Sequence, residues 1–136
     1  TLLVSSAASD VYKRQDDQWS IRRDAAVALG DIGPEARAAV PVLFGMLESE
    51  EDRDAARGAL RSIDDADVDA VPVLIEGLRS DDRRRRYYAV SLLRKVGPAA
   101  KEALPDLRKM MEEDDSRRMR DFLRKAIENI DRDDDN

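Results

Sequence analysis

Apolar residues recur along this chain with a period of just over thirty residues. Three prolines mark one segment of the period, because each lies in a short apolar stretch. The stretches are Val40-Pro41-Val42-Leu43, Val71-Pro72-Val73-Leu74 and Leu104-Pro105-Asp106-Leu107. The spacings between the prolines are 31 and 33 residues. A period of this length is typical of proteins built from stacked helical units.

A second segment of the period carries an arginine that is followed by apolar residues three, six, seven and ten positions later. The pattern occurs four times, in Arg22/Ala25/Ala28/Leu29/Ile32, Arg53/Ala56/Ala59/Leu60/Ile63, Arg86/Ala89/Leu92/Leu93/Val96 and Arg120/Leu123/Ala126/Ile127/Ile130. Offsets of three and four residues place apolar side chains on one face of an α-helix. We therefore predict four amphipathic helices in register.

Glycine, proline and acidic residues predict where the helices begin and end. Gly33-Pro34 and Gly97-Pro98 place glycine just after one helix and proline at the start of the next. Acidic clusters at 48–52, 81–82 and 114–116 supply N-caps and negative charge to the helices that follow. The predicted helices span 17–32, 35–48, 51–63, 67–79, 82–96, 99–113 and 116–130.

The three prolines of the apolar stretches fall inside predicted helices. Proline lacks a backbone N–H and its ring clashes with the preceding turn. We expect Pro41, Pro72 and Pro105 each to kink its helix or to restart it after one turn.

These segments resemble HEAT repeats, in particular the short bacterial type that also occurs in phycobilisome lyase-like proteins. The resemblance covers about residues 16–130, with the proline segment as helix A and the arginine segment as helix B. Helix B of that family opens with Val-Arg after an Asp-rich turn. Ile21-Arg22 and Met119-Arg120 keep this apolar–Arg pair, whereas Asp52-Arg53 and Arg85-Arg86 keep only the arginine. The resemblance implies an all-α, right-handed solenoid of stacked antiparallel helix pairs, with about seven helices and a concave face lined by B helices.

The domain organisation follows from this assignment. Helix 17–32 is a B helix without an A partner, the repeats span 35–63, 67–96 and 99–130, and residues 131–136 form an acidic tail. A solenoid unit cannot bury its apolar face alone. We therefore expect Trp19, Ile21 or Ala25 to be partly uncovered.

Residues 1–15 do not match the repeats that follow. The stretch 5–15, Ser-Ser-Ala-Ala-Ser-Asp-Val-Tyr-Lys-Arg-Gln, resembles the in-frame translation of a transposon adapter used to prepare sequencing libraries. Such segments are excluded from fold reasoning. We expect residues 1–15 to be non-native and irregular or disordered, and the rest to be a fragment of a larger bacterial HEAT-repeat protein.

Composition narrows the possible functions. The 136 residues include 24 basic and 30 acidic side chains, a net charge of −6, and neither His nor Cys. The chain therefore lacks the commonest general base, a thiolate nucleophile and the usual zinc ligands. It also lacks a phosphate-binding glycine loop and any apolar run of the roughly 18 residues that span a membrane. We expect a cytoplasmic protein that is not an enzyme, with no cofactor, catalytic residue or metal site.

The four arginines of the repeated pattern, Arg22, Arg53, Arg86 and Arg120, recur at one position of the repeat. They could form a ladder of anion-binding groups. A residue that recurs once per repeat serves the repeat itself, so we favour a structural role. In that role, which the resemblance also implies, each guanidinium ties neighbouring turns together through nearby carboxylates.

The densest basic and aromatic patch is the run Arg83-Arg84-Arg85-Arg86-Tyr87-Tyr88. Arginine and tyrosine are favoured at binding hot spots. We expect the concave face to bind another protein through seven residues: Arg84, Tyr87, Ser91, Asp54, Arg57, Asp121 and Lys125. The alternative is that the patch is only a solvated face. Separately, Tyr88 could belong to the core between repeats, because Phe122 occupies the equivalent position of the next repeat.

Other functions remain open at this stage. The repeats could only space a larger protein, or could serve an enzyme as an accessory module, as in a phycobilin lyase-like protein. HEAT-like DNA-binding proteins use a basic groove, but Asp24, Asp54 and Asp121 lie near the same face here. Nucleic acid is therefore the less favoured partner. We expect a monomer unless the uncovered face of helix 17–32 associates with itself.

Overall fold

The computed structural model describes residues 20–132, and every regular element in that range is helical. The prediction of an all-α protein is therefore confirmed. The adapter-like segment 1–15, Trp19 and residues 133–136 of the predicted acidic tail lie outside the described range.

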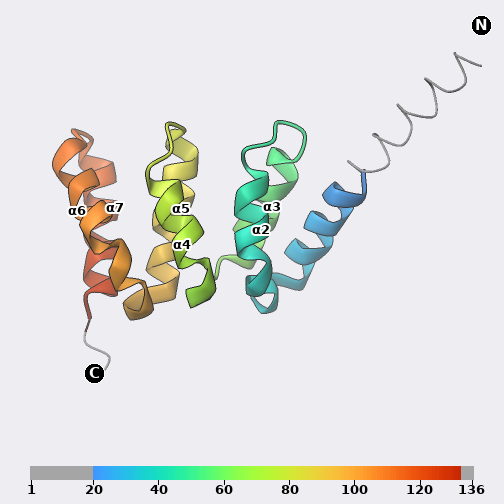
Figure 1. The fold of residues 1–136 in the computed structure, drawn as a ribbon, viewed down its shortest axis with the longest axis horizontal. Coiled ribbons are helices and arrows are strands. Elements are labelled where there is room, and N and C mark those ends of the chain that lie inside the picture. Colours follow the sequence, from blue (N-terminus) through green and yellow to red (C-terminus); the bar gives the residue numbers. More distant parts are fainter. Residues whose placement is uncertain (1–19, 133–136) are drawn as a thin grey trace, which may run out of the picture.

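The helices form antiparallel pairs that stand side by side in one row (Figure 1). A helix over 20–32 opens the row. The pairs that follow are α2 (Val40–Met46) with α3 (Arg53–Ile63), α4 (Val71–Leu78) with α5 (Arg83–Val96), and α6 (Leu104–Glu113) with α7 (Arg117–Ile130). This arrangement confirms a HEAT-like solenoid with the expected number of helices in the described part of the chain, while the right-handed superhelix stays a prediction.

Each A helix is divided in two, as the prolines predict. Short 3-10 segments, η1 (Gly33–Ala39), η2 (Val68–Ala70) and η3 (Gly97–Ala103), come before α2, α4 and α6. In each α-helix the proline occupies one of the first two positions, where a missing N–H removes no hydrogen bond. The predicted restart at each proline is therefore confirmed within 35–48, 67–79 and 99–113, and the segment before each restart is 3-10 rather than α-helical.

The ends of the B helices follow the expected chemistry with one exception. Gly33 and Gly97 adopt positive φ values of 80° and 76° directly after their helices. Asp82 and Ser116 accept hydrogen bonds from the backbone of the first turns of α5 and α7. Asp52 was expected to cap α3 in the same way, but its carboxylate bonds Arg22 instead, at 3.1 Å.

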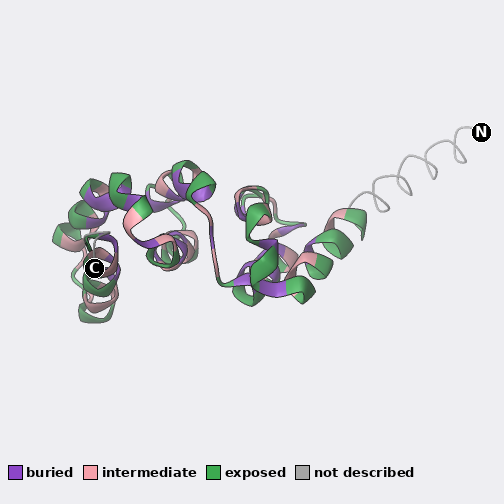
Figure 2. Cartoon of the chain, turned by 90° about the horizontal axis from the view of Figure 1, so that it is seen from below, coloured by how far each residue is buried: buried purple, intermediate pink, exposed green. Residues whose placement is uncertain are grey.

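The apolar stripes of α3, α5 and α7 form the core together with the A helices (Figure 2). Helix 20–32 differs, because Ala28 and Ile32 of its stripe are exposed and Ala26 is buried in their place. This exposure confirms the prediction that one face of this helix is partly uncovered, since no A helix among residues 20–132 covers that side. Ile21, which is 66% exposed, and Ala25 are also uncovered.

The two junctions between the three pairs are built differently. The B helices α5 and α7 pack directly against each other. Between the first two pairs the A helices meet instead, where the ring of Phe44 lies against Gly77, and α3 and α5 make no comparable contact. Arg85 fills this junction, with its guanidinium 5.0 Å from the Phe44 ring centroid and an ion pair to Glu48. The face formed by the B helices is therefore open between α3 and α5.

Candidate functional site

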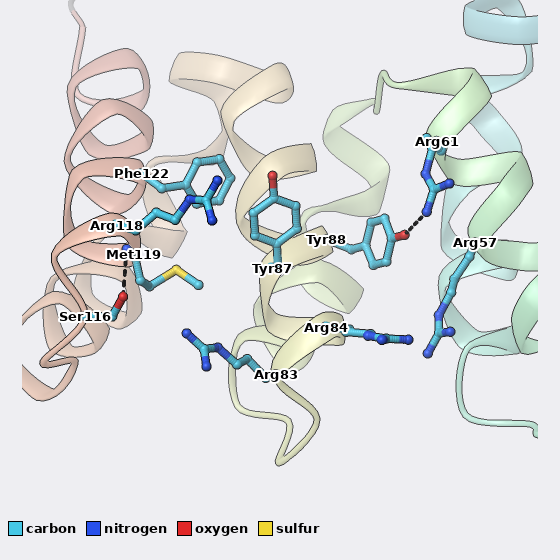
Figure 3. Close-up of a pocket in the computed structure, with 10 residues that line it drawn as sticks. All are labelled: Arg57, Arg61, Arg83, Arg84, Tyr87, Tyr88, Ser116, Arg118, Met119 and Phe122. Carbon is cyan, nitrogen blue, oxygen red and sulfur yellow. Dashed lines mark hydrogen bonds between the residues drawn. The ribbon is translucent and has the colours of Figure 1, made fainter.

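A groove of about 720 Å³ lies on the face formed by the B helices (Figure 3). Helix α5 forms its centre, with α3 on one side and α7 on the other. Ten residues line it: Arg57, Arg61, Arg83, Arg84, Tyr87, Tyr88, Ser116, Arg118, Met119 and Phe122. We refer to these ten residues as the B-helix groove. Five of them are arginines and none is acidic, so the groove is locally basic in an acidic protein.

The first turns of α5 position the central side chains. Asp82 begins the helix by accepting a hydrogen bond from the backbone N–H of Arg84 at 3.0 Å. Residues three and four apart lie on the same side of a helix. Arg83 and Arg84 therefore lie one turn before Tyr87, and all three side chains are exposed.

Aromatic stacking fixes the orientation of Tyr87. Its ring stacks on Phe122 of α7, with the centroids 4.7 Å apart and the planes at 14°. Tyr88 meets Tyr87 edge to face, with a centroid distance of 6.2 Å. Such pairs contribute about 0.5–1.5 kcal/mol beyond the burial of their area. Tyr87 is nevertheless 48% exposed, so the groove presents an ordered tyrosine to solvent.

On the α3 side, a hydrogen bond crosses the open junction. Arg61 donates to the hydroxyl of Tyr88 at 3.2 Å. This hydrogen bond, with a smaller electrostatic contribution from the same tyrosine, raises the pKa of the Arg61 guanidinium above its ordinary value. Arg57, one turn earlier on α3, lies 3.6 Å from the carboxylate of Asp54.

The remaining arginines of the groove are unpaired within residues 20–132. The side chains of Arg83, Arg84 and Arg118 form neither a hydrogen bond nor an ion pair with any residue of that range. All three are exposed. Each guanidinium therefore keeps its donors available to a ligand.

The family to which the chain belongs indicates what kind of partner such a groove binds. The family model described as HEAT repeats matches residues 40–128, which include all ten residues of the B-helix groove. The chain belongs to the HEAT-repeat family. HEAT repeats generally mediate interactions between proteins. No curated protein and no solved structure matches the chain.

The HEAT fold brings together only some of the residues that the sequence suggested for partner binding. Arg57, Arg84 and Tyr87 line the groove, and Asp54 lies at its edge beside Arg57. Of the other three, Ser91 and Lys125 lie about one turn beyond the lining residues Tyr87 and Phe122, and Asp121 directly precedes Phe122 without lining the groove. Ser91 lines a separate hollow with Asn129, Asp121 pairs with Arg124 at 3.1 Å, and Lys125 is exposed outside the groove.

Sequence reasoning missed several residues of the groove. Arg61, Arg83, Arg118, Ser116, Met119 and Phe122 were not selected as binding residues. The repeat register holds one signal for them, because Phe122 occupies the position in α7 that Tyr88 occupies in α5. The junction between α5 and α7 then brings Phe122 against Tyr87.

Two of the four arginines of the repeated pattern have partners other than the carboxylates that were expected. Arg22 bonds a carboxylate, as expected, and this carboxylate is that of Asp52 in the turn between α2 and α3. Arg53 and Arg86 instead donate to backbone carbonyls six residues earlier, those of Leu47 at 3.1 Å and Ser80 at 2.6 Å. Leu47 is the C-cap of α2, and Ser80 lies in the turn just after α4, so these bonds tie the start of each B helix to the turn before it.

Arg120 does not fit the expected role. It is exposed, and its side chain forms no hydrogen bond or ion pair with the part of the chain that the structure describes. The tie between repeats is provided instead by ion pairs that the sequence pattern did not indicate. They are Arg37–Asp67 at 2.9 Å and Arg79–Asp106 at 3.1 Å, whereas Arg108–Asp131 at 3.5 Å joins α6 to the end of α7 within the last pair.

The helices and acidic side chains of residues 20–132 bear on two other kinds of site. None of the helices there has both the length and the apolar character needed to cross a bilayer. In the same range, no group of three or more acidic side chains is arranged to hold a metal ion.

Proposed function

We propose that this HEAT-repeat protein is a non-catalytic scaffold that binds another protein through the B-helix groove. The observation that carries the proposal is the gathering of exposed arginine and tyrosine side chains from three successive helix pairs in one hollow. Arginine and tyrosine are enriched among the residues that contribute most to protein–protein binding.

The groove is also ordered before any partner arrives. Tyr87 is held by Phe122, and Tyr88 is held by Arg61. The backbone around these residues belongs to helices rather than loops. A preordered surface loses less conformational entropy on binding, so more of the contact energy appears as affinity.

Selection from a displayed library of random peptides tests the proposal without knowledge of the natural partner. The immobilised full chain is used for enrichment, and the enriched peptides are then measured against three variants. Arg84→Glu and Tyr87→Ala change the groove, and Lys109→Glu makes a matched charge reversal on the exposed surface of the A helix α6.

We expect the enriched peptides to lose roughly tenfold or more in affinity with Arg84→Glu and Tyr87→Ala, which corresponds to about 1.4 kcal/mol. Lys109→Glu should leave their affinity within about twofold, since an exposed charge outside a contact contributes little. Peptides that bind all three variants equally would contradict the proposal and locate the binding surface elsewhere.

A further inference from the structure

The B-helix groove has a positive charge, opposite in sign to the net charge of the whole chain. The chain carries a net charge of −6, yet five guanidinium groups and no carboxylate line this hollow. Electrostatic complementarity favours a partner with the opposite charge at the contact. The groove is therefore suited to an anionic ligand, although the protein as a whole repels anions.

Three of these guanidiniums have donors available to an anion. Arg83, Arg84 and Arg118 are exposed and unpaired within residues 20–132. A planar guanidinium donates two parallel hydrogen bonds to a carboxylate, which gives the pair both strength and direction. Arg83 and Arg84 belong to α5 and Arg118 to α7, so guanidinium donors come into the groove from two helices (Figure 3).

The lining between these arginines is apolar and aromatic. Met119 and Phe122 come from α7, and the ring of Tyr87 stacks on Phe122. Such a surface accepts an apolar or aromatic side chain. We infer that the B-helix groove binds an acidic linear segment of a partner protein, with carboxylates on Arg83, Arg84 and Arg118 and an aromatic side chain against Tyr87 and Met119. This inference rests on the proposed function and names the chemistry of the partner.

The surroundings of the groove favour a peptide over a nucleic acid. A nucleic-acid backbone carries charge along its whole length and requires a basic track of matching extent. Here the basic lining is bounded by acidic residues, because Asp54 lies beside Arg57 and Asp82 caps the first turn of α5. A hollow of about 720 Å³ accommodates a few residues of a peptide.

Fluorescence anisotropy with synthetic probes tests this inference on the full chain. The acidic probe is a labelled peptide of sequence Glu-Glu-Phe-Glu-Glu. Its matched controls are Gln-Gln-Phe-Gln-Gln, which removes the charge, and Glu-Glu-Ala-Glu-Glu, which removes the ring. A labelled single-stranded oligothymidine represents nucleic acid.

We expect the acidic probe to bind roughly tenfold or more tightly than either control peptide, and more weakly as salt is added. Arg84→Glu and Arg118→Glu should each weaken it by roughly tenfold or more. Arg94→Glu is the matched control on α5. Arg94 lies ten residues after Arg84, which is about 15 Å farther along the helix, and it is outside the groove. It should change the affinity by less than about twofold. Circular dichroism of each variant confirms that it is folded.

Three results would overturn the inference. Equal binding of the acidic and the uncharged peptides would show that the arginines do not select carboxylates. Tighter binding of the oligonucleotide, lost with Arg84→Glu and Arg118→Glu, would assign the groove to nucleic acid. If library-selected peptides bind the groove while the acidic probe does not, the proposed function stands and this inference alone fails.

Discussion

Gly77 of α4 lies at the contact between the first two helix pairs, against the ring of Phe44. A Cβ atom on this glycine would overlap the ring of Phe44 and lie 3.2 Å from the side chain of Ala89. Both neighbours are fully buried, so neither has free space into which it can move. The absence of a side chain at Gly77 is therefore a requirement of this junction.

Gly77→Ala should accordingly destabilise the fold by about 1–3 kcal/mol through overpacking. Gly58→Ala is the matched control, because Gly58 lies inside α3 with nothing near the position of its Cβ. That variant should gain about 0.5–1 kcal/mol, since alanine is the better helix former. Urea unfolding of both variants measures the difference. A Gly77→Ala protein as stable as the wild type would contradict the close approach.

Arg86 stabilises the turn between α4 and α5 by donating a hydrogen bond to the carbonyl of Ser80. Arg86→Ala should lower the free energy of unfolding by about 1–3 kcal/mol, because a half-buried carbonyl loses a charged donor. Arg120→Ala removes the residue at the same repeat position where no such bond exists, and should cost less than about 0.5 kcal/mol. Thermal melting distinguishes the two. Unchanged melting of Arg86→Ala together with lost peptide binding would instead assign Arg86 to the binding surface.

These residues also show the limit of sequence reasoning at this scale. The periodic pattern predicts that Arg22, Arg53, Arg86 and Arg120 occupy one position. It does not predict their partners, because a long guanidinium side chain reaches either a carboxylate or a carbonyl depending on the local turn. Arg22 meets Asp52, whereas Arg53 meets the carbonyl of Leu47.

At the scale of helices, local sequence predicts the elements well and the junctions poorly. Pro41, Pro72 and Pro105 restart their helices, since the effect of proline depends only on the chain next to it. The opening between α3 and α5 depends on how two repeats pack, which helical periodicity does not encode. The groove extends from that opening across α5 to α7, and only three of the seven suggested binding residues line it.

Arg85 fills the junction between the first two helix pairs. Two substitutions distinguish the contribution of its packing to stability from the contribution of its charge. Its side chain is 14% exposed and its Nε finds no hydrogen-bond partner in the described chain. Arg85→Ala should cost about 2 kcal/mol or more, because it removes the contact with Phe44. Arg85→Met keeps an extended side chain against the ring and should stay within about 1.5 kcal/mol of the wild type.

Chemical denaturation of the two Arg85 variants gives the comparison. Glu48, the partner in the ion pair, is 66% exposed, so its charge stays solvated when Arg85 is replaced. Equal losses in Arg85→Ala and Arg85→Met would show that the charge, and not the packing, stabilises the junction.

At the scale of the whole molecule, stability is distributed unevenly along the row of helices. The apolar stripe of helix 20–32 is largely exposed, whereas those of α3, α5 and α7 are largely buried (Figure 2). In solenoids each unit depends on its neighbours for stability. Segments with few buried apolar contacts open at lower free energy than the core.

Hydrogen exchange measured by mass spectrometry should therefore show faster exchange in peptides from 20–32 than in peptides from α5, by roughly tenfold or more. The measurement is made at low protein concentration and repeated at high concentration. Equal protection of the two segments at low concentration would contradict the account. Protection of 20–32 that appears only at high concentration would show that its uncovered face associates with a second copy.

The central claim is that the B-helix groove is the surface at which this HEAT-repeat protein binds its partner. The most direct test is a titration of isotope-labelled protein with a library-selected peptide, followed residue by residue in ¹H–¹⁵N NMR spectra. The account predicts that the shifted resonances cluster around Arg84 and Tyr87 of α5 and Arg118 and Phe122 of α7. Shifts confined to the A helices α4 and α6, with these four residues unmoved, would contradict it.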